Sequence, residues 1–114
     1  ITDALLGACA LGDIGQHFPD TSDEYENIDS RILLRKAHKL ITDENYYIAN
    51  VDATIVAEQP KLAPHITKMR ENLAQDLQVD ISQVSVKATT AEGMGFEGKG
   101  QGISARAVAL LKES

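Results

Sequence analysis

Apolar residues recur at helical spacing in three stretches of the chain. In the first stretch Ala4, Leu5, Ala8 and Leu11 fall on one stripe, which predicts an amphipathic helix already under way at the first residue. Glycine commonly follows a helix end, because it adopts the left-handed conformation without steric cost. We therefore expect this helix to stop at Gly12.

The other two helical stretches begin at recognisable start signals. Asp29 or Ser30 can cap a helix that runs to about Glu44, because a side-chain oxygen there accepts from a free backbone N–H of the first turn. Pro64 suits the first turn of a third helix. The predicted apolar faces comprise Ile32, Leu33, Ala37, Leu40 and Ile41 in the one helix and Ile66, Met69, Leu73 and Leu77 in the other.

Two further stretches alternate with period two and predict strands. They are residues 47–57 (YIANVDATIVA) and residues 83–90 (QVSVKATT). The last run, residues 102–112 (GISARAVALLK), is ambiguous, because its alanines and leucines also favour a helix. Its alternation favours a strand that lies beside the preceding one.

The order helix, helix, strand, helix, strand, strand predicts an α+β fold, with helices packed on one face of a small mixed sheet. The length of 114 residues is that of one domain, so residues 1–114 are expected to form a single unit. Three strands leave exposed sheet edges. Further strands, from residues upstream of Ile1 or from neighbouring subunits, are therefore expected, and with them an oligomer.

Composition narrows the classes of function. The net charge of −6 leaves no basic surface of the kind that a nucleic-acid backbone requires. No apolar run approaches the roughly 20 residues of a membrane helix. The single cysteine, Cys9, has no partner for an internal disulfide and is expected to be a buried thiol. We expect a cytoplasmic protein without nucleic-acid or membrane partners.

The first of three loops that adjoin these elements carries two carboxylates. Residues 13–22 include Asp13 and Asp20, next to Gly15 and Phe18. Carboxylates on a structured loop can accept hydrogen bonds from sugar hydroxyls or bind a metal ion. Acidic turns are also common on solvated surfaces, so the loop alone does not decide between these roles.

The second loop, residues 57–63, holds a lysine between stiff neighbours. Lys61 follows Pro60 at the predicted end of a strand, so its ammonium group can be directed toward a phosphate. A plain surface lysine would give the same pattern.

The third loop, TTAEGMGFEGKGQG at residues 89–102, contains five of the eight glycines. Thr89 and Thr90 supply hydroxyls, Glu92 a hard oxygen ligand for Mg²⁺ or Mn²⁺, and Lys99 a cation. This mixture suits a phosphorylated ligand with a metal. The glycines match neither a Walker loop nor a dinucleotide fingerprint, so a bent hairpin or bulged strand pair remains as good an interpretation as a ligand cradle.

Other catalytic chemistry has little support in the sequence. His17, His38 and His65 lack the spacing and companion acid of a zinc motif. We expect surface or capping roles for all three. There is no G-x-S-x-G motif, and Cys9 has no evident base partner.

Several strings along the chain share a wider pattern. They are TDALLGACALGDIGQHFPDT, DSRILL, NVDATIVAEQPKLAPHI, MR, VSVKATTAEGMGFEGKGQGI and AVALL. Together they closely resemble the 2-C-methyl-D-erythritol 2,4-cyclodiphosphate synthase family, over essentially all 114 residues. The resemblance implies a homotrimer whose sheets face the threefold axis, with active sites between subunits.

The reaction that the resemblance implies is an intramolecular phosphoryl transfer in non-mevalonate isoprenoid biosynthesis. The substrate, 4-diphosphocytidyl-2-C-methyl-D-erythritol 2-phosphate, becomes the 2,4-cyclodiphosphate and releases CMP. Because the substrate's own phosphate is the nucleophile, the protein's work is positioning and charge neutralisation.

Family roles carry over to matching positions as expectations. Asp13 and Gly15 would receive the cytidine ribose, Thr90 would stabilise the transition state as the catalytic residue, and Glu92 would ligate Mg²⁺ or Mn²⁺. The implied substrate-binding residues are Asp13, Ile14, Gly15, Phe18, Pro19, Asp20, Thr21, Ser22, Ala57, Glu58, Gln59, Pro60, Lys61, Leu62, Ala63, Thr89, Thr90, Ala91, Glu92, Phe96 and Lys99.

The chain departs from the family pattern in two ways. Ser22, Ala91 and Lys99 stand where the family usually has aspartate, threonine and arginine, and lysine keeps the charge of arginine but loses its bidentate fork. The family's Zn²⁺ ligands, an Asp-x-His motif and a further histidine, would all precede Ile1, as would a His-Ser pair that contacts substrate. We expect these residues in an upstream segment that was lost, was cleaved or lies outside this sequence.

Two other functions remain open at this point. One is a non-catalytic trimeric protein that binds a nucleotide or metabolite on the same fold. The other is a structural interaction domain without a ligand, for which CMP and Mg²⁺ would not raise the melting temperature.

Overall fold

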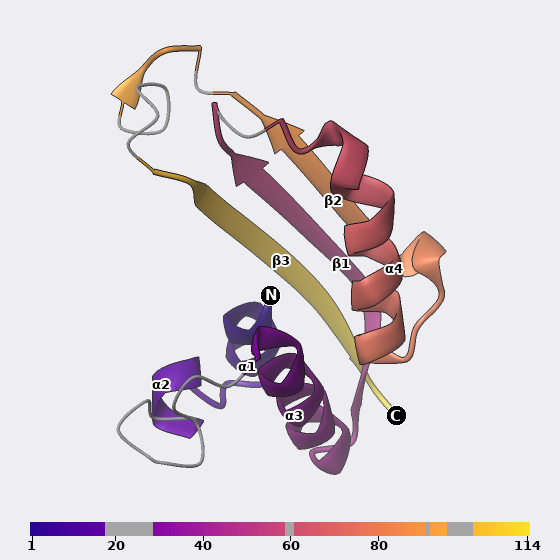
Figure 1. Ribbon diagram of the computed structural model, residues 1–114. Helices are drawn as coiled ribbons and strands as arrows, with labels where there is room; N and C mark the ends of the chain where they lie inside the picture. Colours follow the sequence, from indigo (N-terminus) through magenta and orange to yellow (C-terminus); the bar gives the residue numbers. More distant parts are fainter. Residues whose placement is uncertain (18–28, 59–60, 91, 96–101) are drawn as a thin grey trace.

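The computed structural model describes residues 1–17, 29–58, 61–90, 92–95 and 102–114. Helices and strands follow one another in a mixed order (Figure 1). The elements are α1 (Thr2–Ala8), α2 (Ile14–His17), α3 (Ser30–Asp43), β1 (Tyr46–Val56), α4 (Ile66–Leu77), β2 (Val84–Thr89) and β3 (Ser104–Glu113), with short 3-10 turns at Ala63–His65 and Ile81–Gln83.

The three strands form one mixed sheet in the order β2-β1-β3. β1 pairs parallel with β2, with Val51 opposite Val84. It pairs antiparallel with β3, with Val51 opposite Ala109. The strand interpretation of the ambiguous last run is therefore confirmed, since β3 satisfies its backbone groups by pairing with β1 over its length.

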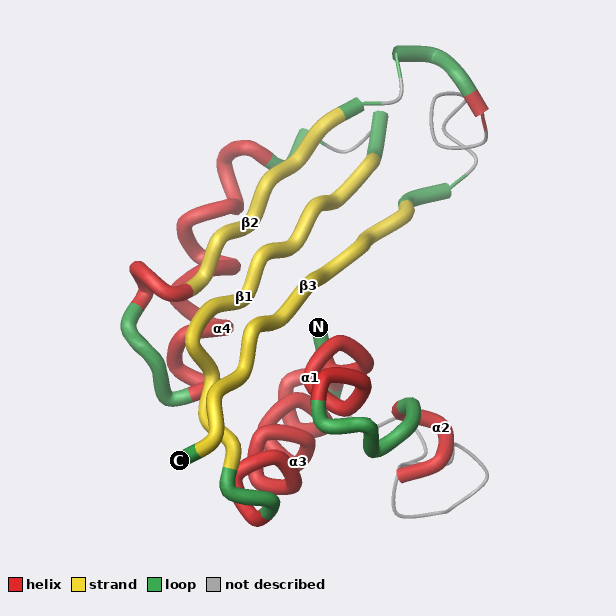
Figure 2. Tube along the Cα trace, turned by 180° about the vertical axis from the view of Figure 1, so that it is seen from behind, coloured by secondary structure: helices red, strands yellow, loops and turns green. Residues whose placement is uncertain are grey.

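Helices cover one face of this sheet, as predicted. α4 packs on β2, whereas α1 packs on β3 and α3 packs on β1. Figure 2 shows the opposite side of the molecule, where the three strands lie nearer the viewer than α4. The face that they cover carries the apolar side of the alternation in each strand. Its main core cluster consists of Leu5, Leu34, Ile41, Ile48, Val51 and Leu77, all buried.

The first helix ends earlier than Gly12, so this predicted boundary was wrong. α1 stops at Ala8, because Ala10 takes the left-handed conformation (φ 57°). The N–H of Leu11 then donates to the carbonyl of Leu6 at 2.8 Å, which is the closing bond of a Schellman motif. Gly12 (φ 92°) serves instead to turn the chain toward α2.

The loop predicted after Gly12 contains one helical turn, which the turn residues of the sequence alone did not specify. Residues Ile14–His17 form the single turn α2. Asp13 begins it, because its Oδ1 accepts from the N–H of Gln16 at 3.0 Å, and Asp3 Oδ1 accepts from the N–H of Ile14 at 2.7 Å. Side-chain oxygens thus satisfy backbone donors that the short helix leaves free.

The other helix boundaries agree with the sequence. Asp29 caps α3 by accepting from the N–H of Arg31 at 2.8 Å. Pro64 lies in the 3-10 turn that leads into α4. Gln78 ends α4 in the left-handed conformation, a position that glycine more often occupies.

One charged residue of the described chain is buried in the core. Asp76 on α4 is 2% exposed, and it receives a fork of two hydrogen bonds from Arg31 on α3, from Nε at 2.7 Å and from a terminal nitrogen at 3.0 Å. The hydrogen bond to Asp76 raises the pKa of the Arg31 guanidinium above its ordinary value. Because a buried carboxylate is tolerated only when it is paired, this contact fixes α3 against α4.

Replacing Asp76 by asparagine should destabilise the fold by about 1–3 kcal/mol, since the buried position of residue 76 then lacks the charged acceptor for Arg31. The midpoint of urea unfolding measures the effect. Asp43→Asn is the matched control, because its carboxylate makes an exposed ion pair with Lys39 at 3.1 Å, and such pairs contribute about 0.5 kcal/mol or less. Equal midpoints for the two variants would contradict a structural role for the buried pair.

Candidate functional site

The carboxyl ends of β1 and β2 lie side by side at one end of the sheet (Figure 1). Val56 is opposite Thr89 in the last position of the parallel ladder. The N–H of Ala57 then donates to the carbonyl of Thr89 at 3.0 Å, which continues the pairing one residue beyond β1. The loops that follow parallel strands begin at the same edge of a sheet. Residues 57–63 and the residues after Thr89 therefore begin close together.

A hollow of about 280 Å³ lies between these two strand exits; we call it the strand-end hollow. Lys61, Thr89 and Thr90 supply its polar groups. Its full lining comprises Ala57, Glu58, Lys61, Leu62, Ala63, Ala88, Thr89 and Thr90. The second loop and the first two residues of the third loop therefore line the same hollow.

The two threonine hydroxyls of this hollow have different partners. Thr89 Oγ1 donates to the carbonyl oxygen of Thr90 at 3.3 Å. Thr90 Oγ1 accepts from the N–H of Glu92 at 3.3 Å. A hydroxyl that accepts a hydrogen bond retains its own proton for donation, so Thr90 is suited to donate to an oxygen of a bound ligand.

The chain turns sharply after Thr90, through backbone conformations that side chains rarely adopt. Glu92, Gly93 and Gly95 all have positive φ values, of 54°, 79° and 68°. Glycine reaches this region without cost, whereas a residue with a Cβ is strained there. The described part of the glycine loop is thus a defined turn, and it presents the Glu92 side chain to solvent.

The first predicted loop lies elsewhere in the chain. The residues at the start of α2 are Asp13, Ile14 and Gly15, and α2 contacts α1. Figures 1 and 2 both place α2 away from the ends of β1 and β2. Within one chain, the predicted ribose-binding residues are therefore separate from the strand-end hollow.

Ten of the predicted site residues lie outside the described part of the chain. They are Phe18, Pro19, Asp20, Thr21, Ser22, Gln59, Pro60, Ala91, Phe96 and Lys99. Their predicted contacts, including the three departures from the family pattern, stay predictions.

The described residues fit one of the two expected metal sites. Glu92 offers an exposed carboxylate, and Mg²⁺ is typically held by one or two protein carboxylates together with substrate phosphates and water. Among the described residues, no three histidine, cysteine, aspartate or glutamate side chains cluster as a metal site. They do not fit a zinc site, and its ligands upstream of Ile1 stay a prediction.

Cys9 is poorly placed to act as a nucleophile. Cys9 is half-buried, and it packs against the main core cluster. Burial raises the pKa of its thiol, which disfavours the reactive thiolate.

The sequence did not single out Ala88, which lines the strand-end hollow. Ala88 is exposed at the end of β2. The parallel register was the missing information, because it places Ala88 opposite Ile55 only two residues before β1 runs into the second loop.

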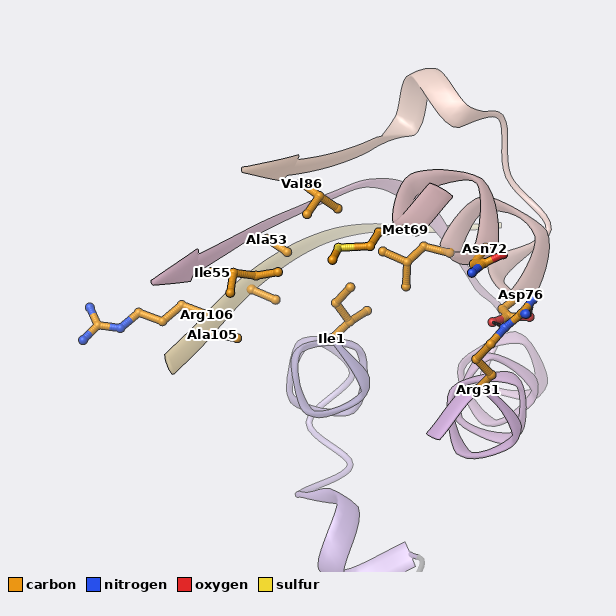
Figure 3. Close-up of a pocket in the computed structure, with 12 residues that line it drawn as sticks. Ile1, Arg31, Ala53, Ile55, Met69, Asn72, Asp76, Val86, Ala105 and Arg106 are labelled. Atoms are coloured by element: carbon orange, nitrogen blue, oxygen red, sulfur yellow. Dashed lines mark hydrogen bonds and ion pairs between the residues drawn. The ribbon is translucent and has the colours of Figure 1, made fainter. Parts of the chain in front are cut away.

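A larger hollow of about 310 Å³ lies between the sheet and helices α1 and α4 (Figure 3). Its walls are mostly apolar, with Ile1 and Met69 among them and Arg31, Asp76 and Asn72 at one side. None of the predicted site residues lines it.

The described chain contains no helix long and apolar enough to span a membrane.

Adding a methyl group at Gly93 tests the turn. Gly93→Ala meets no atom within 4 Å of its new Cβ, so only the positive φ opposes it, and we expect a loss of up to about 1–2 kcal/mol in unfolding free energy. Gly7→Ala is the control, because its Cβ also meets nothing within 4 Å and alanine should stabilise helix α1 by about 0.8–1.0 kcal/mol. If urea unfolding showed that both substitutions raise the unfolding free energy, or that both lower it, the left-handed turn would be contradicted.

Comparison with known proteins gives a consistent match. Residues 1–112 match the YgbB family. A curated 2-C-methyl-D-erythritol 2,4-cyclodiphosphate synthase from Methylococcus capsulatus is 63% identical over 111 residues, which are 97% of this chain and 70% of that protein. The one from Pseudoalteromonas translucida is 58% identical over 115 residues, covering 100% of this chain and 70% of that protein.

Solved structures agree with these relatives. The bifunctional IspDF from Campylobacter jejuni superposes with a TM-score of 0.94 at 37% identity, covering 99% of this chain and 31% of that one. IspF from Plasmodium falciparum, in a CDP complex, gives a TM-score of 0.86 at 37% identity, covering 98% of this chain and 67% of that one. By sequence and by fold, the chain belongs to the YgbB family, the family of the 2-C-methyl-D-erythritol 2,4-cyclodiphosphate synthases.

Proposed function

We propose that the protein converts 4-diphosphocytidyl-2-C-methyl-D-erythritol 2-phosphate into 2-C-methyl-D-erythritol 2,4-cyclodiphosphate and CMP, as the names of its relatives indicate. The observation that carries this proposal is the strand-end hollow, which gathers Lys61, Thr89 and Thr90. The CDP complex of the Plasmodium falciparum relative supports a cytidyl nucleotide as the ligand.

The reaction needs no nucleophile from the protein. An oxygen of the substrate's 2-phosphate forms a bond to the β-phosphorus, and the bond from that phosphorus to the oxygen bridging it to the α-phosphorus breaks. CMP leaves with the bridging oxygen, and no water is consumed. Catalysis of this kind comes from holding the reacting groups in line and from stabilising the charge on the phosphoryl oxygens.

Three side chains around the strand-end hollow suit these tasks. We assign the ammonium group of Lys61 to the diphosphate, where it neutralises charge. The Thr90 hydroxyl would donate to a phosphoryl oxygen as negative charge develops there. Thr89, beside it, would help to orient the phosphates.

Membership of this family implies dependence on a divalent metal ion. Glu92 is the residue that would hold Mg²⁺ or Mn²⁺, since it is an exposed carboxylate on the turn next to Thr90. A bound Mg²⁺ supplies Lewis-acid stabilisation of the phosphoryl oxygens. A second, zinc-containing site with ligands upstream of Ile1 and a cytoplasmic location both stay predictions.

A homotrimer is the second part of the proposal. The assigned ribose-binding residues, Asp13 and Gly15, lie away from the strand-end hollow of their own chain. A complete site therefore requires the α2 region of one subunit next to the strand ends of another. This separation supports active sites between subunits.

The uncovered face of the sheet supports the same arrangement. Val108 and Leu110 on β3 are 71% and 58% exposed, and Tyr47 on β1 is 48% exposed. Register places these residues on the face opposite the helices, where Asp52 and Lys87 form an ion pair at 2.9 Å. We propose that three copies of this bare face surround the threefold axis, because exposed apolar sheet surface of this kind commonly marks an interface.

Loss of CMP release in site variants of the full-length protein tests the activity. Thr90→Ala and Glu92→Gln should each lower kcat by about 100-fold, the usual effect of removing one group that stabilises the transition state. Glu71→Gln, an exposed glutamate on α4, is the control and should leave kcat unchanged. Undiminished turnover in both site variants would overturn the role assignments, and CMP binding without any turnover would favour the non-catalytic binder.

A charge on the bare face tests the trimer. The unmodified protein should sediment at about three times the mass of one chain, and Val108→Glu should dissociate it, because the symmetry brings three added carboxylates together in an apolar interface. Ile81→Glu is the control, since Ile81 is also exposed but lies in the 3-10 turn before β2. A monomeric unmodified protein, or a trimer that survives Val108→Glu, would contradict this interface.

A further inference from the structure

The geometry points to Glu58 as a positioning residue that holds the turn carrying Glu92, a role that rests on the proposed function of that turn. Glu58 directly follows the backbone bond by which Ala57 extends the β1–β2 pairing. Its Oε1 accepts from the N–H of Gly93 at 3.4 Å, across 35 residues of sequence. This hydrogen bond connects the second loop to the third.

The turn needs support because its backbone is strained. Glu92 has a Cβ and nevertheless takes a φ of 54°, a conformation that costs a residue of this kind roughly 1–2 kcal/mol. Such a conformation persists only when surrounding contacts determine it. Two successive N–H groups of the turn have side-chain acceptors, Thr90 Oγ1 for Glu92 and Glu58 Oε1 for Gly93.

Thr90 and Glu58 differ in their other expected roles. Thr90 is assigned to the substrate phosphates, so its bond to Glu92 can weaken when a ligand binds. Glu58 is half-buried, two residues beyond the end of β1, and its bond to Gly93 does not depend on a ligand. Glu58 therefore keeps the turn that carries Glu92 in place when the Thr90 hydroxyl is engaged elsewhere.

The contact with Gly93 uses an acceptor oxygen of Glu58 and does not require the negative charge. A carboxylate beside a diphosphate site repels the substrate, whereas a glutamine oxygen could accept from Gly93 without that repulsion. Glu58→Gln should therefore preserve the turn, and Glu58→Ala should release it.

Amide hydrogen exchange at Gly93 in the free protein tests the contact. In Glu58→Ala the Gly93 amide should exchange about three- to tenfold faster, which corresponds to the loss of one ordinary hydrogen bond, and in Glu58→Gln it should exchange as in the unmodified protein. Glu71→Ala, at an exposed site on α4, is the matched control. Equal exchange at Gly93 in the unmodified protein and in Glu58→Ala would overturn the proposal.

Metal activation in the full-length enzyme tests the consequence. Glu58→Ala should raise the Mg²⁺ concentration that gives half-maximal CMP release by about three- to tenfold, whereas Glu58→Gln should restore the Mg²⁺ requirement. A Glu58→Gln variant as impaired as Glu58→Ala would contradict the positioning role. If the unmodified enzyme releases no CMP, the proposed function fails, while the exchange experiment still decides whether Glu58 holds the turn.

Discussion

The parallel pairing of β1 with β2 is the constraint on which the site depends. The two strands are separated in sequence by α4, yet their register ends with Val56 opposite Thr89, so the loops that follow both strands start from neighbouring positions. A shift of this register by one residue would turn the covered apolar face to solvent. The burial of Val51, Val84 and Val86 therefore also determines where Lys61 lies relative to Thr90.

The two faces of the sheet differ in what covers them. The covered face is closed by α1, α3 and α4, and the bidentate contact between Arg31 and buried Asp76 joins α3 to α4 beside the core. The opposite face has exposed valine and leucine side chains on β3. A small chain can bury only a limited core of its own, and the proposed trimer would bury this exposed face as well.

Sequence periodicity predicted most of the fold, because helices and strands repeat their apolar residues at different intervals. The sequence offered Asp29 or Ser30 as the α3 cap, of which Asp29 proved correct, and it favoured a strand for the last run. It failed at the end of α1, since Gly12 suggested a stop that Ala10 provides earlier through its left-handed backbone. The pairing of Glu58 with Gly93 was equally invisible, because a contact across 35 residues depends on tertiary packing. The roles of the site residues came from family resemblance, since their glycine spacing matched no general phosphate motif.

A crystal structure of the protein with CDP and Mg²⁺ would test the central claim most directly, namely that the chemistry takes place where β1 and β2 end. The account predicts the diphosphate in the strand-end hollow, with Lys61 and Thr90 within hydrogen-bonding distance of its oxygens and Mg²⁺ on Glu92. It also predicts the ribose next to Asp13 of a neighbouring subunit. A nucleotide bound in the larger hollow between the sheet and α4, or ribose contacts made entirely within one subunit, would contradict it.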